Sequence, residues 1–177
     1  MENIVLMKKS VGIEQLSREL GYSKTLFLGD DFTVVEGNTK KEIMAKMKGK
    51  LPFFYKASNE EMLRFVLEKT DIELIFSVEI IHPYDSVHFI RSGLDPVLCA
   101  IAANREKIIG FSFSDILNSP NKAKTIARMR QNVQLCQKYK VKVLWSTFAG
   151  TKEELRSASD LLVLWGVLGG KETELGL

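Results

Sequence analysis

Short apolar segments alternate with helical segments along the whole chain, and this rhythm constrains the fold more than any other feature. The runs 4–7, 51–55, 108–113 and 142–146 have the length of strands, and they lack the polar alternation of a strand with one wet face. Continuous apolar strands are typical of a parallel sheet covered on both faces. The pattern predicts an α/β fold and leaves open whether the sheet is doubly wound or closed into a barrel.

Three helices in the second half have the clearest signals. Asp95 followed by Pro96 supplies an N-cap and a first helical position. A long helix is predicted to start at Ser119-Pro120 and to run to about Tyr139. The last helix, 161–168, is expected to be capped by Ser159 or Asp160. The residues that form one apolar face after Asp95 are Leu94, Val97, Leu98, Ile101 and Ala102.

A length of 177 residues is typical of one domain. The sequence also contains no internal repeat, low-complexity segment or linker that would divide it, so we expect a single domain over residues 1–177. The chain has two cysteines, too few for the disulfide framework of a secreted protein. The N-terminus lacks a signal-peptide pattern, and the apolar run 161–168 is too short to span a bilayer. We therefore expect a cytoplasmic protein without a membrane partner.

The net charge of +3 is an average over two unlike halves. Residues 1–87 carry 12 basic and 14 acidic side chains, whereas residues 88–177 carry 13 basic and 8 acidic ones. Between Asp115 and Glu153 there is no acidic residue at all. The basic residues of this acid-free interval are Lys122, Lys124, Arg128, Arg130, Lys138, Lys140, Lys142 and Lys152.

The long helix of this interval is predicted to have an apolar face and an opposite basic face. The basic face is expected to carry Lys124, Arg128 and Lys138. A solvated surface with cations near the helix C-terminus would explain the pattern structurally. Phosphate binding is the functional interpretation, and the absence of acids favours it because solvated faces usually mix signs. The residues of the apolar face are Ile126, Met129, Val133 and Cys136.

Signals for catalysis are sparse. The chain contains none of the glycine-rich phosphate-binding motifs and no nucleophile elbow. His82, Asp85 and His88 have metal-ligand chemistry, to which Glu79 and the Asp30-Asp31 pair could add oxygens. Pro83 breaks a helix across this cluster, which favours a loop with capping roles. A small metal-dependent phosphoesterase remains the alternative function.

The helix 161–168 is apolar on almost every side. Leu161, Trp165 and Leu168 lie on one face together with Leu164. Val163 and Val167 lie on the opposite face. A helix of this kind is either fully buried or partly covered by a protein partner, and the sequence leaves both open.

The second half resembles a known family over roughly residues 88–170. The matching blocks occur in order with consistent spacing: Arg91-Ser92-Gly93-Leu94 with Val97-Leu98-Cys99, then 109–114, 117–119, 127–132, 135–141, 155–160 and Leu168-Gly169. These blocks resemble the archaeal ribonuclease P protein component 3 family, the thirty-kilodalton subunit family shared with eukaryotes. The first half matches only in its rhythm of strands and helices.

The resemblance implies a compact (β/α) TIM-like barrel related in shape to metal-dependent phosphoesterase (PHP-like) barrels. Since such barrels typically take about 250 residues, 177 residues imply either very short loops or an incomplete set of elements. It implies a subunit that is not a catalyst alone and that binds no cofactor. The RNA of ribonuclease P, with magnesium, removes the 5′ leader from precursor tRNA. Implied partners are this RNA, protein component 2 and other protein subunits, with precursor tRNA reached indirectly. The subunit would stabilise the catalytic domain of the RNA together with component 2.

The resemblance also implies which residues contact RNA. Lys138, Lys140 and Arg156 match basic positions of the family, and Arg91 is a further candidate at the Arg-Ser-Gly-Leu motif. Lesser contributions are expected from Lys124, Arg128, Arg130 and Lys142. An RNA-binding barrel outside ribonuclease P is a further alternative.

Overall fold

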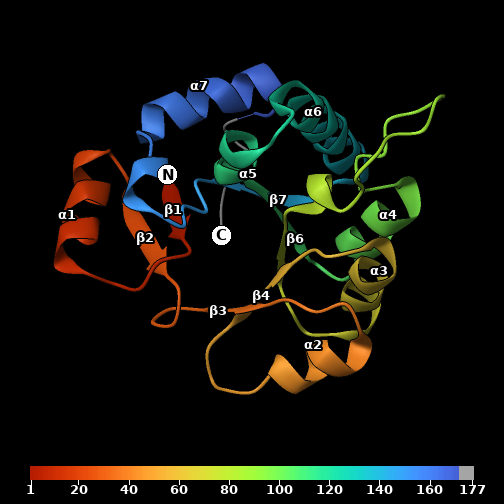
Figure 1. Ribbon diagram of the computed structural model, residues 1–177, viewed down its shortest axis with the longest axis horizontal. Coiled ribbons are helices and arrows are strands. Elements are labelled where there is room, and N and C mark those ends of the chain that lie inside the picture. The colour runs from red at the N-terminus through yellow and green to blue at the C-terminus, as the bar shows by residue number, and fades with distance from the viewer. Residues whose placement is uncertain (172–177) are drawn as a thin grey trace.

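Parallel strands and helices alternate along residues 1–171, the part of the chain that the computed structural model describes (Figure 1). The strands are β1 Glu2–Val5, β2 Lys24–Phe27, β3 Thr33–Val35, β4 Phe53–Lys56, β5 Leu74–Phe76, β6 Ile108–Ser112 and β7 Lys142–Ser146. The helices are α1 Val11–Glu19, α2 Lys40–Lys46, α3 Glu60–Lys69, α4 Pro96–Asn104, α5 Phe113–Asn118, α6 Lys122–Tyr139 and α7 Ala158–Leu168. Short 3-10 turns are η1 Val78–Ile80 and η2 Lys152–Glu154. The predicted α/β class is confirmed.

The strands form two parallel sheets. One has the order β1-β2 and the other the order β3-β4-β5-β6-β7. Single bridges link their ends, between Val5 and Ala149 and between Leu28 and Phe32. Figure 1 shows the strands around a common centre with the helices outside. Hydrogen-bonded ladders do not join the two sheets in the described residues. The structure therefore has the expected parallel α/β arrangement, but these residues do not form a closed sheet.

Apolar side chains from both sheets fill the space that the strands surround. The rings of Phe32 and Phe54 stack with centroids 4.4 Å apart, and those of Phe76 and Phe148 with centroids 4.6 Å apart. A Cβ at Gly110 would lie only 3.0 Å from the Phe148 ring, so the absence of a side chain at this strand position makes space for the ring. The buried members of this inner cluster are Ile4, Phe32, Phe54, Leu74, Phe76, Leu144 and Phe148.

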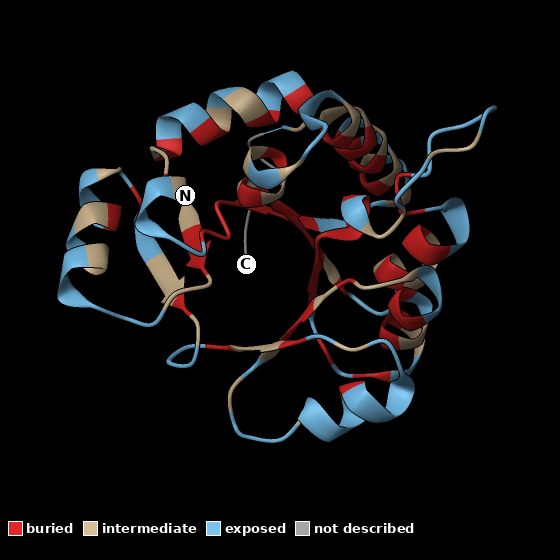
Figure 2. Cartoon of the chain, viewed as in Figure 1, coloured by how far each residue is buried: buried red, intermediate tan, exposed pale blue. Residues whose placement is uncertain are grey.

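A larger core lies between the strands and the helices, whose inner faces are buried (Figure 2). The Trp145 and Trp165 rings stack 5.9 Å apart, and the Trp145 indole N–H donates to the Leu161 carbonyl at 2.7 Å. The face of α7 with Leu161, Trp165 and Leu168 is buried in the core, and Leu164 is partly buried. Val163 and Val167, on its outer face, are 70% and 63% exposed.

Two of the predicted helix starts are wrong by a few residues. Ser157, rather than Ser159 or Asp160, caps α7, because its hydroxyl accepts the Asp160 N–H. The segment after Ser112 forms the short helix α5. Helix α6 then begins at Lys122 instead of Ser119-Pro120, with Asn121 as its N-cap. The predicted Asp95 cap of α4 is confirmed, with its carboxylate accepting the Leu98 N–H at 2.7 Å.

Both cysteines, Cys99 and Cys136, are buried, and neither is in a disulfide. Over residues 1–171, no helix combines the length and the apolar character that crossing a membrane requires.

Candidate nucleic-acid interface

Helix α6 presents its two faces much as its sequence predicts, with one exception. Its 18 residues contain no acid, and at 1.5 Å per residue they extend about 27 Å. Met129, Val133 and Cys136 are buried against the core, and Ile126 is partly buried. The apolar face is therefore confirmed. The exception is Arg128, which the helical spacing placed on the exposed basic face.

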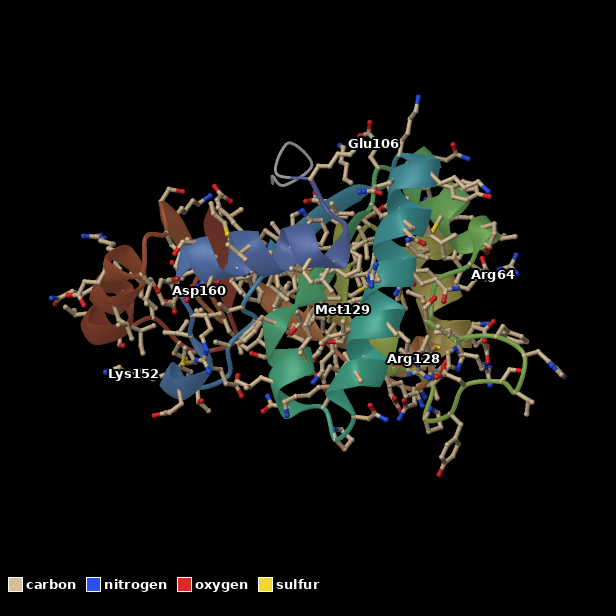
Figure 3. All side chains as sticks on the ribbon, turned by 90° about the horizontal axis from the view of Figure 1, so that it is seen from above. Arg64, Glu106, Arg128, Met129, Lys152 and Asp160 are labelled. Carbon is tan, nitrogen blue, oxygen red and sulfur yellow. The ribbon has the colours of Figure 1, made fainter. Side chains whose placement is uncertain are left out.

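Arg128 is buried, with 3% of its surface exposed. Its Nε and Nη2 donate to Asp85 Oδ1 at 2.9 and 2.6 Å. Its Nη1 donates to the carbonyls of Glu79 and His82 at 2.8 and 2.7 Å. The expectation of an exposed Arg128 is wrong because residues 79–85 cover this side of α6. Figure 3 labels Arg128 on the helix. Its donors already have partners within the fold.

The Asp85 carboxylate is the centre of this network. It lies 3.8 Å from Lys124 Nζ and also accepts the Arg91 backbone N–H at 2.9 Å. Partial desolvation raises the pKa of Asp85, but the hydrogen bonds from Arg128 and Arg91 outweigh it and hold the pKa below its ordinary value. Lys124 Nζ also donates to the Pro83 carbonyl at 2.9 Å. Lys124 and Arg128 are therefore both engaged with residues 79–85.

Three further candidates also have partners. The Arg91 guanidinium lies 3.7 Å from Glu60. Arg156 donates to the Glu153 and Leu155 carbonyls, with its guanidinium 5.6 Å from the Phe113 ring centroid. Lys142 Nζ lies 3.9 Å from Glu106, an ion pair so exposed that it contributes little.

Arg130, Lys138 and Lys140 are different, and we call them the α6 basic group. All three are exposed, and no carboxylate of residues 1–171 lies within ion-pair distance of them. Lys138 Nζ lies 5.7 Å from the Tyr139 ring centroid. Lys140 caps the helix in the left-handed region, at φ 57°. These cations can meet an anion without first breaking an ion pair.

The eight predicted RNA-contact residues thus fall into separate groups. Lys124, Arg128 and Arg91 surround Asp85 near the N-terminal half of α6. Lys140 and Lys142 line a pocket of about 300 Å³ at the other end of the helix. Arg156 lies apart from both groups, beside Phe113 at the start of α5. Lys122, which the acid-free interval includes but the resemblance did not single out, is also exposed.

The side chains proposed as metal ligands are not brought together. Asp85 is held by Arg128, His82 Nε2 lies 3.7 Å from Glu60, and His88 is exposed. Burial lowers the pKa of His82, and the nearby Arg91 charge lowers it further. Asp30 and Asp31 accept the backbone N–H groups of Lys9 and Phe27. In the described part of the chain, no three His, Cys, Asp or Glu side chains form a group that could hold a metal ion.

Comparison with known proteins gives a partial sequence match and a shared fold. No family model matches the chain. A stretch of 72 residues is 35% identical to ribonuclease P protein component 3 of Methanocaldococcus jannaschii. This stretch is 40% of the present chain and spans 31% of that relative's length.

The fold is similar to that of a chain in the cryo-EM structure of archaeal ribonuclease P with mature tRNA. The TM-score is 0.68, and the match covers 98% of this chain and 85% of that chain at 20% sequence identity. The likeness extends over the first half as well, where the sequence showed only the rhythm of strands and helices. At this identity it shows a shared fold.

One surface feature was missed by sequence reasoning. Residues 80–90 project from the body between η1 and α4 (Figure 1), and several of their apolar side chains are exposed. These side chains have neither helical nor strand periodicity, so no pattern singled them out. Their only signal is the occurrence of large apolar residues within a segment that also contains Pro83, Asp85 and Ser86.

Proposed function

We propose that this chain is an RNA-binding protein subunit of ribonuclease P, the ribonucleoprotein that removes 5′ leaders from precursor tRNA. The observation that carries the proposal is the α6 basic group, whose three exposed cations lie on a helix without acids. The partial sequence match to component 3 and the shared fold support the same assignment. The subunit binds and stabilises the catalytic domain of the RNA together with protein component 2.

The rest of the proposal follows from this role. The RNA supplies the catalysis and holds the magnesium, while this protein binds no cofactor of its own and acts in the cytoplasm beside other ribonuclease P subunits. The two single bridges between the sheets support the closure of the seven described strands into a small barrel. The stacked Phe pairs that fill its interior support a scaffold rather than a substrate cavity.

The contact residues can be ranked by what binding would cost. Arg130, Lys138 and Lys140 can neutralise phosphates directly, because no ion pair must be given up. Lys142 follows, since its pair with Glu106 is long and exposed. Arg91, Lys124 and Arg156 would lose existing contacts, and Arg128 would have to leave the interior. The rank separates residues that the sequence could only list together.

Replacing Lys138 and Lys140 with alanine is expected to flatten the salt dependence of binding to ribonuclease P RNA. Each phosphate contact contributes roughly 0.7–0.9 to the slope of log affinity against log salt concentration, so the double variant should lose about 1.5. The slope is measured by titrating labelled RNA at several potassium chloride concentrations.

The matched control is Lys41→Ala with Lys48→Ala. It removes the same charge from exposed lysines of the α2 region, on the opposite side of the molecule in Figure 1. The control should keep the wild-type slope. Equal losses in both double variants would mean that binding depends on net charge alone and would remove α6 from the interface.

Reconstitution tests the function itself. Adding the chain together with component 2 to ribonuclease P RNA should raise the rate of leader cleavage at a magnesium concentration where the RNA alone is slow. Gel analysis of labelled precursor tRNA measures the rate. A rate that stays at the level of RNA with component 2 alone would overturn the assignment.

A further inference from the structure

Exposed apolar side chains gather in one part of the surface. Ten large apolar residues are exposed in the described chain, and six of them lie between residues 80 and 97. Val87 is 96% exposed, Tyr84 79% and Phe89 64%. Clusters of exposed apolar side chains mark interaction sites in soluble proteins. We call the projecting residues 80–90 the apolar arm. The six residues are Ile80, Tyr84, Val87, Phe89, Ile90 and, on α4, Val97.

The apolar arm is anchored at its base by side chains of α6. Arg128 donates to the carbonyl of Glu79, just before the arm, and to that of His82 within it, and Lys124 donates to that of Pro83. Just after the arm, Asn132 Nδ2 donates to the Ser92 carbonyl at 2.8 Å. The fold thus uses a buried guanidinium to hold apolar side chains out in water. Such preorganisation lowers the entropic cost of binding a partner.

A groove adjoins the arm. It has a volume of about 810 Å³ and lies between the arm, the start of α4 and the side of α6. Apolar residues from all three elements line it, among them Phe89, Ile90, Leu94, Pro96, Leu98 and Leu135, together with polar and charged residues such as Glu60, Asp85 and Arg91. A convex apolar tip beside a groove with apolar side chains in its walls can enclose an extended segment or a helix from two sides.

The charges of this region favour a protein over RNA as the occupant. Lys124 and Arg128 are paired with Asp85, and Arg91 lies 3.7 Å from Glu60. RNA binding needs cations that are available to phosphates, and Lys124 and Arg128 beside the arm are engaged within the fold. Of the available cations, Lys138 and Lys140 lie at the other end of α6, and Arg130 does not line the groove. An uncharged apolar segment matches this surface, because its burial leaves no charge without a partner.

We infer that the apolar arm and its groove bind a protein partner through an uncharged apolar segment, on a surface separate from the α6 basic group. The inference rests on the proposed function, in which the chain assembles with a second protein as well as with RNA. It adds the location and the chemistry of that contact. The exposed valines of α7, which the sequence left as a candidate interface, serve as the comparison surface.

The test uses Val87→Ser with Phe89→Ser in the full chain, and titration calorimetry with purified ribonuclease P protein component 2 as the probe. We expect at least a tenfold increase in Kd. A second variant, Val97→Ser, changes the exposed surface of α4 next to the groove-lining residues Pro96 and Leu98 and should weaken binding several-fold. All three residues are more than half exposed, so the variants should keep the wild-type melting temperature.

The matched control is Val163→Ser with Val167→Ser, which removes exposed valines from α7. It should leave Kd within twofold, and both arm variants should keep the wild-type affinity for ribonuclease P RNA. An unchanged Kd in the arm variants would overturn the inference while leaving the proposed function intact. A loss of affinity for component 2 confined to the α7 control would overturn it in the same way.

Two further outcomes would overturn the assignment of the occupant. Lower RNA affinity in the arm variants with unchanged Kd for component 2 would make the arm an RNA contact. Self-association of the wild type in sedimentation, abolished by the arm variants, would make the occupant a second copy of the chain. If the wild type fails to bind component 2, this inference fails, and the RNA titrations still test the α6 basic group independently.

Discussion

Replacing Arg128 with methionine is expected to lower the free energy of unfolding by about 3 kcal/mol, since removing one partner of a buried charge pair is strongly destabilising. Methionine keeps much of the length and the apolar stem of the side chain, so the loss reports on the guanidinium. Without it, Asp85 loses its shortest ion pair, at 2.6 Å, and the carbonyls of Glu79 and His82 lose their donor. Each unsatisfied buried polar group costs roughly 1–3 kcal/mol.

Urea unfolding followed by circular dichroism measures this loss. The control is Arg130→Met two residues along the same helix, where the side chain is exposed and has no carboxylate partner within residues 1–171. Its effect should stay within about 0.5 kcal/mol. Amide exchange should also quicken around residues 80–90 in the Arg128 variant alone. Equal destabilisation by both changes would show that the network around Asp85 contributes nothing specific.

Arg128 also shows which properties of a side chain a helical pattern can predict. The spacing of Met129, Val133 and Cys136 predicted the buried face of α6 because apolar side chains must be covered by something. The same spacing gives only an angle for Arg128. Whether that angle faces water depends on residues 79–85, more than forty positions earlier in the chain. Lys138, by contrast, is exposed as predicted, because no segment of residues 1–171 covers that end of the helix face.

The fold was predictable at the level of elements and not at the level of closure. Short apolar runs predicted the strands, and the Asp95-Pro96 signal predicted the start of α4. Whether parallel strands close into a barrel depends on pairings between distant segments, such as the bridge between Val5 and Ala149. Local periodicity contains no information on such pairings. The same limit applies to the ion pairs of Arg91 and Lys142, whose partners Glu60 and Glu106 lie 31 and 36 residues earlier in the chain.

Glu79 is a second buried ionisable residue, and its substitution should reveal a large pH dependence of the free energy of unfolding. The residue is fully buried in η1, and its Oε1 accepts from Asn132 Nδ2 at 3.2 Å. Its Oε2 has no hydrogen-bond partner in the described chain. Desolvation raises the pKa of Glu79 to about 8, and the neighbouring Asp115 charge contributes in the same direction. Glu79 is therefore protonated in the folded protein at neutral pH.

A raised pKa makes the folded state bind more protons than the unfolded state between pH 4.5, the ordinary value for Glu79, and about 8. The contribution of Glu79 to stability is therefore fully present below pH 4.5 and is lost as the pH rises through this window. Glutamine, which is neutral at every pH, removes the loss. We expect the free energy of unfolding of Glu79→Gln, relative to the wild type, to rise by about 4 kcal/mol from pH 4.5 to pH 8.

The comparison of the two proteins isolates Glu79, because Asp115, Asp85 and His82 titrate in both. Urea unfolding at four or five pH values between 4.5 and 8 gives the difference directly. The exposed control Glu106→Gln should change stability by less than about 0.5 kcal/mol at either end of the range. Parallel curves for wild type and Glu79→Gln would mean that Glu79 ionises in the folded protein as it does in the unfolded chain.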